Sequence, residues 1–176
     1  HFVSNAEERE AAEVLGDSFD ITFGRTINEL SIWIAKSKPH IEGRFGFFYE
    51  LLVVYSRHNH TDARVLKLIS ETLSNPKFAP RLDPNVVLLI HNGEAKRTEE
   101  LCKEETKRIV IPFTRAEILS PSKGSLFIRN KIAEHTGKLD LFGQANPIYS
   151  DKHFFGRRIL VQEMYRRLTT KEENLG

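Results

Sequence analysis

Cysteine, methionine and tryptophan each occur only once among the 176 residues. The single cysteine, Cys102, has no partner for an internal disulfide, and we therefore expect a cytoplasmic protein, because disulfide-stapled domains belong to oxidising compartments. No apolar run approaches the roughly 20 residues that span a bilayer, so a membrane partner is not expected. The chain begins at His1 without a methionine or the apolar segment of a signal peptide, which predicts a fragment of a longer protein.

Neither sign of charge dominates. Lysine and arginine number 26 against 24 aspartates and glutamates, which leaves a net charge of +2. Nucleic-acid binding would need basic residues gathered on one face, so this balance leaves that class of partner open. Hydrophobic residues make up 40% and charged residues 28%, a composition that can bury a core. The length indicates one domain with an appendage.

Short apolar runs alternate with amphipathic stretches along the first part of the chain. The patterns predict strands at 17–23, 51–55, 86–90 and 109–113, and helices at 5–15, 27–38, 63–74, 94–107 and 121–136. The run at 51–55 is the clearest strand, since a continuous apolar stretch with valines at its centre is typical of a strand covered on both faces. The alternation predicts right-handed crossovers and an open, three-layer α/β domain with a parallel sheet, flavodoxin-like or Rossmann-like, over residues 1–137.

Two glycines and three phenylalanines are concentrated at 43–48. Glycines at this spacing suggest a bend in the chain. The phenylalanines favour packing against the core over a ligand-binding role, because large aromatic side chains are most often buried.

The loop after the strand at 51–55 is the richest candidate site. Ligands of open parallel sheets bind beyond the carboxyl ends of the strands, and a helix that begins there attracts anions. The candidate ligand residues are Ser56, Arg57, His58, His60 and Asp62, with His91 at the end of the neighbouring predicted strand. The two loop histidines could ligate a metal, but no third ligand is evident in the sequence, so no metal site is predicted. A polar loop without chemistry is the alternative.

No complete catalytic constellation is found in the sequence. A restriction-type nuclease needs an acidic residue and a Glu-x-Lys pair on a strand to hold magnesium and orient water. Glu50 begins a suitable strand, but no lysine follows it at the required position. The catalytic residues are therefore unknown.

The pair Tyr55-Ser56 is similar to the Tyr-Ser pair that ends the first strand of Toll/interleukin-receptor-like domains. That resemblance implies an α/β fold and, in the catalytic members, cleavage of NAD by a glutamate on a later helix. This chain departs from the pattern because 50 residues precede the matching strand at Leu51. The helix on which the glutamate would lie is also too rich in acidic residues to single one out.

The segment Phe154-Phe155-Gly156-Arg157 resembles the Phe-(Phe/Val)-Gly-Arg motif that opens the nucleotide-binding module of STAND-type and related AAA+ ATPases. In those families the motif lies against the adenine and precedes the phosphate loop. Arg158 departs from the acidic residue that usually follows. The resemblance implies that these four residues are adjacent to a nucleotide.

The same resemblance divides the chain into an α/β domain at 1–137, a linker at 138–153 and the start of a truncated NTPase domain at 154–176. No cofactor is then expected in the present chain, and ATP and magnesium would be held by the sequence that follows it. We expect a sensor, effector or adaptor module controlled by this downstream NTPase domain, in a defence or signalling system. A hydrolase effector that cleaves NAD or nucleic acid through the loop 56–62 is the alternative. Whether the protein forms a homo-oligomer is left open.

Overall fold

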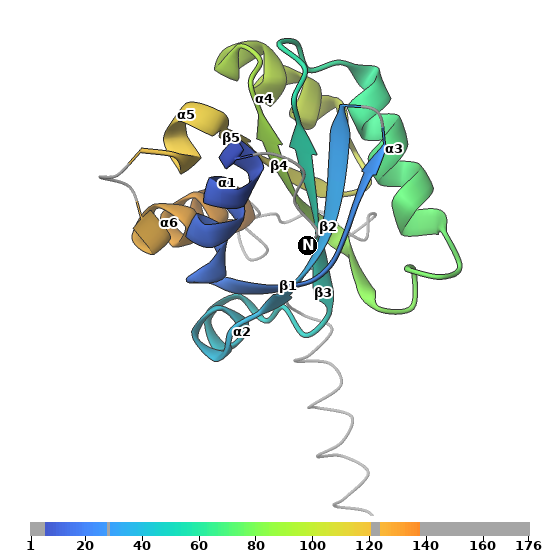
Figure 1. Ribbon diagram of the computed structural model, residues 1–176. Coiled ribbons are helices and arrows are strands. Elements are labelled where there is room, and N and C mark those ends of the chain that lie inside the picture. The colour runs from blue at the N-terminus through green and yellow to red at the C-terminus, as the bar shows by residue number, and fades with distance from the viewer. Residues whose placement is uncertain (1–5, 28, 121–123, 138–176) are drawn as a thin grey trace, which may run out of the picture.

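The computed structural model describes residues 6–27, 29–120 and 124–137, which form helices packed on both faces of one sheet (Figure 1). The elements in chain order are α1 (Ala6–Gly16), β1 (Phe19–Ile27), β2 (Leu30–Ser37), α2 (Pro39–Phe45), β3 (Glu50–Ser56), α3 (Ala63–Ser74), β4 (Leu82–His91), α4 (Ala95–Glu104), β5 (Ile109–Thr114), α5 (Arg115–Ile118) and α6 (Gly124–Gly137). The predicted linker at 138–153 and the segment 154–176 lie outside the described residues.

The sheet of the described residues has five strands in the order β1-β2-β3-β4-β5. Strand β2 runs antiparallel to both β1 and β3, whereas β3, β4 and β5 are parallel to one another. The predicted α/β class and the open sheet with parallel strands are confirmed. The parallel strands are those joined through α3 and α4, since a parallel pair needs a crossover connection, which is usually a helix.

The predicted helix at 27–38 is wrong, since β2 occupies most of that range. Leu30 and Ile34 have helical spacing, but residues 30–35 are all buried, as in a strand covered on both faces. A short run of this kind does not reveal its period, and pairing with two neighbouring strands decides the outcome. Pro39, which follows the range of this predicted helix, stands at the first turn of α2, where its missing N–H costs no hydrogen bond.

Each face of the sheet carries its own core. On one face α1, α2, α5 and α6 pack on alternate strand residues, and Trp33 stacks on Tyr55 with 5.5 Å between ring centroids. On the other face Val65 and Ile69 of α3 and Cys102 of α4 cover the remaining residues of the strands. The three layers are thus helices, sheet and helices, as the sequence predicted.

Strand β5 forms one edge of the described sheet, because β4 is its pairing partner in this part of the chain. Pro112 lies within β5 and is paired with Leu89. A proline cannot donate to a ladder and is tolerated in edge strands, where its missing N–H faces outward.

None of the helices in the described ranges has the length and the apolar character that a bilayer crossing requires.

Replacement of the buried indole tests the core. We expect Trp33→Ala to lower the free energy of unfolding by about 3–5 kcal/mol, because the ring is fully buried in the core between the sheet and its helices. Phe48→Ala is the matched control, since that ring is 59% exposed and its loss should change stability by no more than about 0.5 kcal/mol. Urea denaturation followed by circular dichroism measures both, as Trp33 is the only tryptophan for fluorescence. Equal losses in the two variants would contradict the assignment of the core.

Candidate functional site

The carboxyl ends of the three parallel strands lie side by side at one end of the sheet, together with the start of β2. Tyr55 pairs with Ile90, which places Ser56 beside His91, and His91 pairs in turn with Thr114. The predicted ligand loop after β3 and the predicted histidine at the end of β4 are therefore neighbours.

The two loops that leave this edge are fixed against each other. The side-chain amide of Asn92 donates a hydrogen bond of 2.9 Å to Oδ1 of Asn59. A Cβ atom on Gly93 would lie 2.9 Å from Oγ1 and 3.0 Å from the backbone nitrogen of Thr61, so a glycine is required by this close approach. The loop 56–62 is thus held in place by the β4–α4 turn.

His91 is enclosed in the protein. It is 1% exposed, and its Nδ1 lies 3.3 Å from Oγ1 of Thr98 on α4. Burial, with a further contribution from the charge of Lys131, lowers the pKa of His91 to about 4. The imidazole is therefore neutral near pH 7 and is packed against a helix.

The other titratable residues of the loop have separate local partners. Nδ1 of His58 lies 2.7 Å from a carboxylate oxygen of Glu29, and His60 is exposed. Asp62 caps the N-terminus of α3 by accepting the backbone N–H of Arg64 at 2.9 Å. The side-chain hydrogen bond from Arg64 also lowers the pKa of the Asp62 carboxyl. The structure thus brings Ser56 and His91 together but does not gather the histidines and the carboxylate around one point.

A buried carboxylate lies at the same end of the strands and was not among the site residues predicted from the sequence. Glu8 of α1 is fully buried and accepts hydrogen bonds from Ser31 Oγ at 3.0 Å and from Arg57 Nε at 2.7 Å. The sequence did carry a signal, because Glu8 shares one helical face with the buried Ala11 and Leu15. Arg57, predicted as an anion-binding residue, is engaged by this carboxylate.

Tyr55 adjoins this pair on the same face of the sheet. Its hydroxyl is buried without a hydrogen-bond partner among the described residues. Burial raises the pKa of Tyr55 to about 12, the Glu8 charge adds to the rise and Arg57 opposes it. The guanidinium of Arg115 lies 5.8 Å from the centre of the ring and pairs with Glu7. The cluster therefore consists of two arginine–glutamate pairs around a phenol that stays protonated.

A magnesium-type site does not form around the strand ends described above. The described part of the chain contains no group of three or more histidine, cysteine, aspartate or glutamate side chains placed to hold a metal ion. Glu50, considered in the sequence as the start of a nuclease strand, lies at the opposite end of β3. There its carboxylate accepts hydrogen bonds from Arg81 and from Thr22, and the Arg81 hydrogen bond lowers its pKa.

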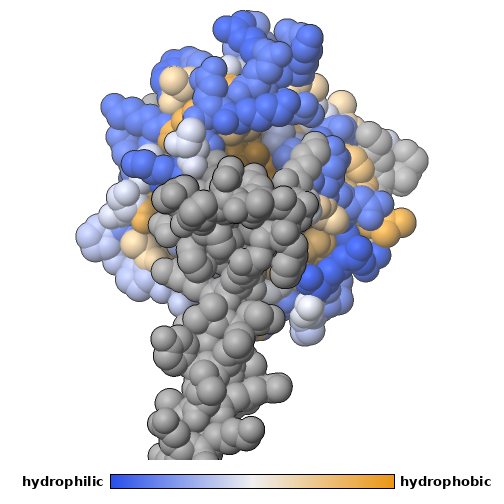
Figure 2. All heavy atoms as spheres, turned by 180° about the vertical axis from the view of Figure 1, so that it is seen from behind, coloured by the Kyte–Doolittle hydropathy of each residue, from blue (hydrophilic) through white to orange (hydrophobic). Residues whose placement is uncertain are grey.

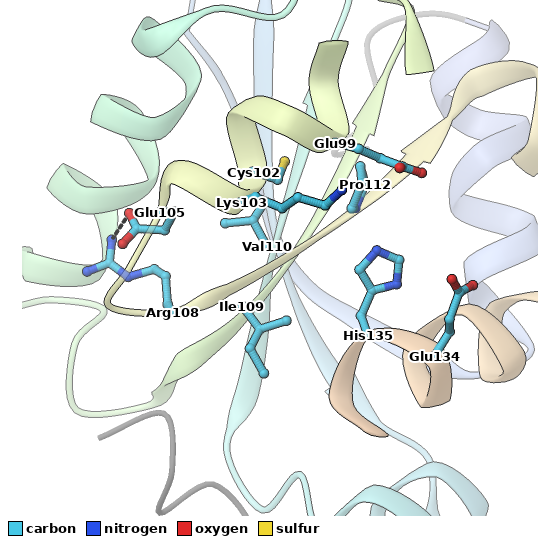
Figure 3. Close-up of a pocket in the computed structure, with 10 residues that line it drawn as sticks. All are labelled: Glu99, Cys102, Lys103, Glu105, Arg108, Ile109, Val110, Pro112, Glu134 and His135. Atoms are coloured by element: carbon cyan, nitrogen blue, oxygen red, sulfur yellow. Dashed lines mark ion pairs between the residues drawn. The ribbon is translucent and has the colours of Figure 1, made fainter. Parts of the chain in front are cut away.

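A hollow of about 260 Å³ lies beside β5, between α4 and α6 (Figure 3). Its walls combine Ile109, Val110 and Pro112 with polar side chains from the two helices. His135 Nδ1 lies 2.9 Å from the backbone carbonyl of Lys131. A carbonyl can only accept, so Nδ1 donates this hydrogen bond.

Cys102 also lines this hollow, but its thiol is not activated. Burial raises its pKa to about 12, and the charge of Glu99 adds to the rise. A thiolate is the nucleophilic form of cysteine, so the residue acts here as a small apolar side chain.

Comparison of the chain with family models, with curated proteins and with solved structures finds no match. The residues of the predicted nucleotide-adjacent motif, Phe154, Phe155, Gly156 and Arg157, lie outside the described residues.

The buried ion pair can be tested by removing its cation. We expect Arg57→Ala to lower the free energy of unfolding by at least about 2 kcal/mol, because the fully buried Glu8 carboxylate loses a charged partner. Arg64→Ala is the control, since its pair with Asp62 is 72% and 41% exposed and should contribute less than about 1 kcal/mol. Chemical denaturation measures both. A loss at Arg57 no larger than that at Arg64 would show that the pair is not a structural link.

The buried histidine predicts acid sensitivity. Its folded pKa of about 4 lies below the ordinary 6.5, so between these values the unfolded chain binds more protons at His91 than the folded chain. The free energy of unfolding should then fall by at most about 3 kcal/mol as the pH falls from 6.5 to 4. His91→Gln should remove most of this slope above pH 5.5, where the carboxylates are largely ionised in both states, and substitution of the exposed His40 should not. Denaturation at a series of pH values measures the slope, and an unchanged slope in His91→Gln would refute this assignment.

Proposed function

We propose that the α/β domain is a non-catalytic sensor or adaptor module, controlled by an NTPase domain of the same chain. ATP and magnesium would be bound by that domain. A defence or signalling role would follow from this arrangement of an α/β module and a regulatory NTPase.

The observation that carries the proposal is that the polar residues at the carboxyl ends of the strands bind other parts of the protein. An enzyme with an open parallel sheet presents its reactive groups there. In this molecule Glu8 is bonded to Arg57 and Ser31, and His91 is neutral and packed on α4. These contacts hold helices and loops on the sheet, and they favour a regulatory module over a hydrolase.

The hollow between α4 and α6 supports the sensor role. It lies between two helices and the edge strand β5, and α6 contributes Glu134 and His135 to its wall (Figure 3). α6 is also the described helix that precedes the predicted linker and the motif at 154–157. A ligand held in the hollow would contact the element that leads toward the proposed NTPase.

The alternative hydrolase needs its acidic and basic groups to converge. His58 is paired with Glu29, and Asp62 is the N-cap of α3. His60 is exposed, and His91 is buried on Thr98. Separate local partners of this kind do not favour cleavage of NAD or nucleic acid by the loop 56–62.

Nucleotide binding by the full-length protein tests the proposal. Arg157→Ala should weaken binding of ATP in the presence of magnesium about tenfold or more, because the motif arginine would contact the nucleotide through charge-assisted hydrogen bonds. Arg158→Ala is the matched control, since this arginine stands where the motif has an acidic residue and its loss should leave the affinity within about twofold. Isothermal titration calorimetry measures both variants. Unchanged affinity in Arg157→Ala, or no ATP binding by the full-length protein, would refute control by an NTPase.

A further inference from the structure

A second hollow, of about 310 Å³, lies at the opposite, amino edge of the parallel strands. The end of β2, the turn after α2, the start of β3 and the residue before β4 form it. The lining residues that matter here are Lys36, Ser37, Phe48, Tyr49, Glu50 and Arg81. Seen from behind, the described surface is mostly hydrophilic, with hydrophobic residues in separate small patches (Figure 2).

Two aromatic rings stand out on the wall of this hollow. Gly46 ends α2 in the left-handed region at φ 70°, and its N–H bonds to the carbonyl of Glu42 at 2.8 Å. The turn sends Phe47 into the core but leaves Phe48 59% and Tyr49 56% exposed. Exposed adjacent rings are costly in water, so packing, which the sequence favoured for this segment, explains Phe47 but not these two.

A guanidinium is held rigidly beside the rings. Arg81 binds the Glu50 carboxylate through Nε and Nη2, with the Nη2–Oε1 distance at 2.9 Å, and Thr22 donates to the same carboxylate at 2.7 Å. This fork leaves the Nη1 donors for another acceptor, and the Arg81 side chain is 47% exposed. Lys36 adds a second exposed cation to the lining.

Ser37 also lines the hollow, but its hydroxyl is closed off from solvent and does not offer a contact to a ligand there. The groups that a ligand can reach are the two exposed rings and the two cations. Stacking surface and cations are thus brought together in one hollow.

We propose that this hollow binds unpaired bases of a single-stranded nucleic acid. Bases stack on Phe48 and on Tyr49, and Arg81 and Lys36 receive the adjoining phosphates. Aromatic faces beside basic side chains are the usual platform for single strands, because every base has a face that stacks.

The same side chains disfavour other ligands. Bases in a duplex are already stacked on each other and do not present their faces. The carboxylates of Glu42 and Glu50 also line the hollow and repel the concentrated charge of a free nucleoside triphosphate, whereas a strand carries one charge per nucleotide. The apolar surface is too small, with charged residues on its borders, for a stable protein interface.

Fluorescence anisotropy with a labelled oligothymidylate of about ten nucleotides tests the proposal on the 176-residue chain. We expect Phe48→Ala and Tyr49→Ala each to weaken binding about fivefold or more, because each ring stacks on a base. Lys36→Ala should reduce the salt dependence of binding, since it removes one phosphate contact. Leu126→Ala is the matched control: it removes another exposed large apolar side chain, at 57% exposure, and should leave the affinity unchanged.

Four results would overturn the proposal. They are no binding up to about 100 µM, equal affinity for the matched duplex, equal affinity for thymidine monophosphate, and unchanged affinity in a double Phe48→Ala, Tyr49→Ala variant. Phe48→Trp keeps a stacking ring and guards against misfolding of the alanine variants. Its affinity should stay within about twofold, and bound strand should quench the added tryptophan.

Discussion

Burial of the Glu8 carboxylate is the constraint on which the arrangement at the carboxyl ends of the strands depends. It comes from the first helix, accepts from β2 through Ser31, and binds Arg57 just after β3. One side chain therefore joins three segments that are far apart in sequence. A carboxylate buried in this way is stable only while its partners stay in place, so α1, β2 and the loop after β3 must keep one arrangement.

This constraint affects where the molecule can bind a ligand. The edge at which open parallel sheets place their reactive groups is occupied by contacts of the protein with itself. The two hollows lie elsewhere, one beside β5 and one at the amino edge, where Phe48 and Tyr49 are exposed. The first adjoins α6, where the proposed regulatory ligand would bind, and the second combines aromatic faces with cations. The two hollows are lined by different elements.

The sequence predicted those parts of the fold in which one residue pattern has one outcome. The run at 51–55 and the stripe of Val65 and Ile69 became β3 and α3 as expected. Strand β2 was missed because a short, wholly buried run has no visible period, and pairing with two neighbours decided its form. The proximity of Ser56 to His91 followed from strand order, but the Glu8–Arg57 pair did not, since the packing of α1 on the sheet depends on contacts across the whole domain.

The strand order has a consequence for how the domain is made. Every strand of the described sheet lies beside the strand that comes before it in the chain. No strand has to enter between two that are already paired, and pairings between neighbours in sequence close short loops. During synthesis the sheet can therefore grow from β1 toward β5, one strand at a time, as the ribosome releases the chain.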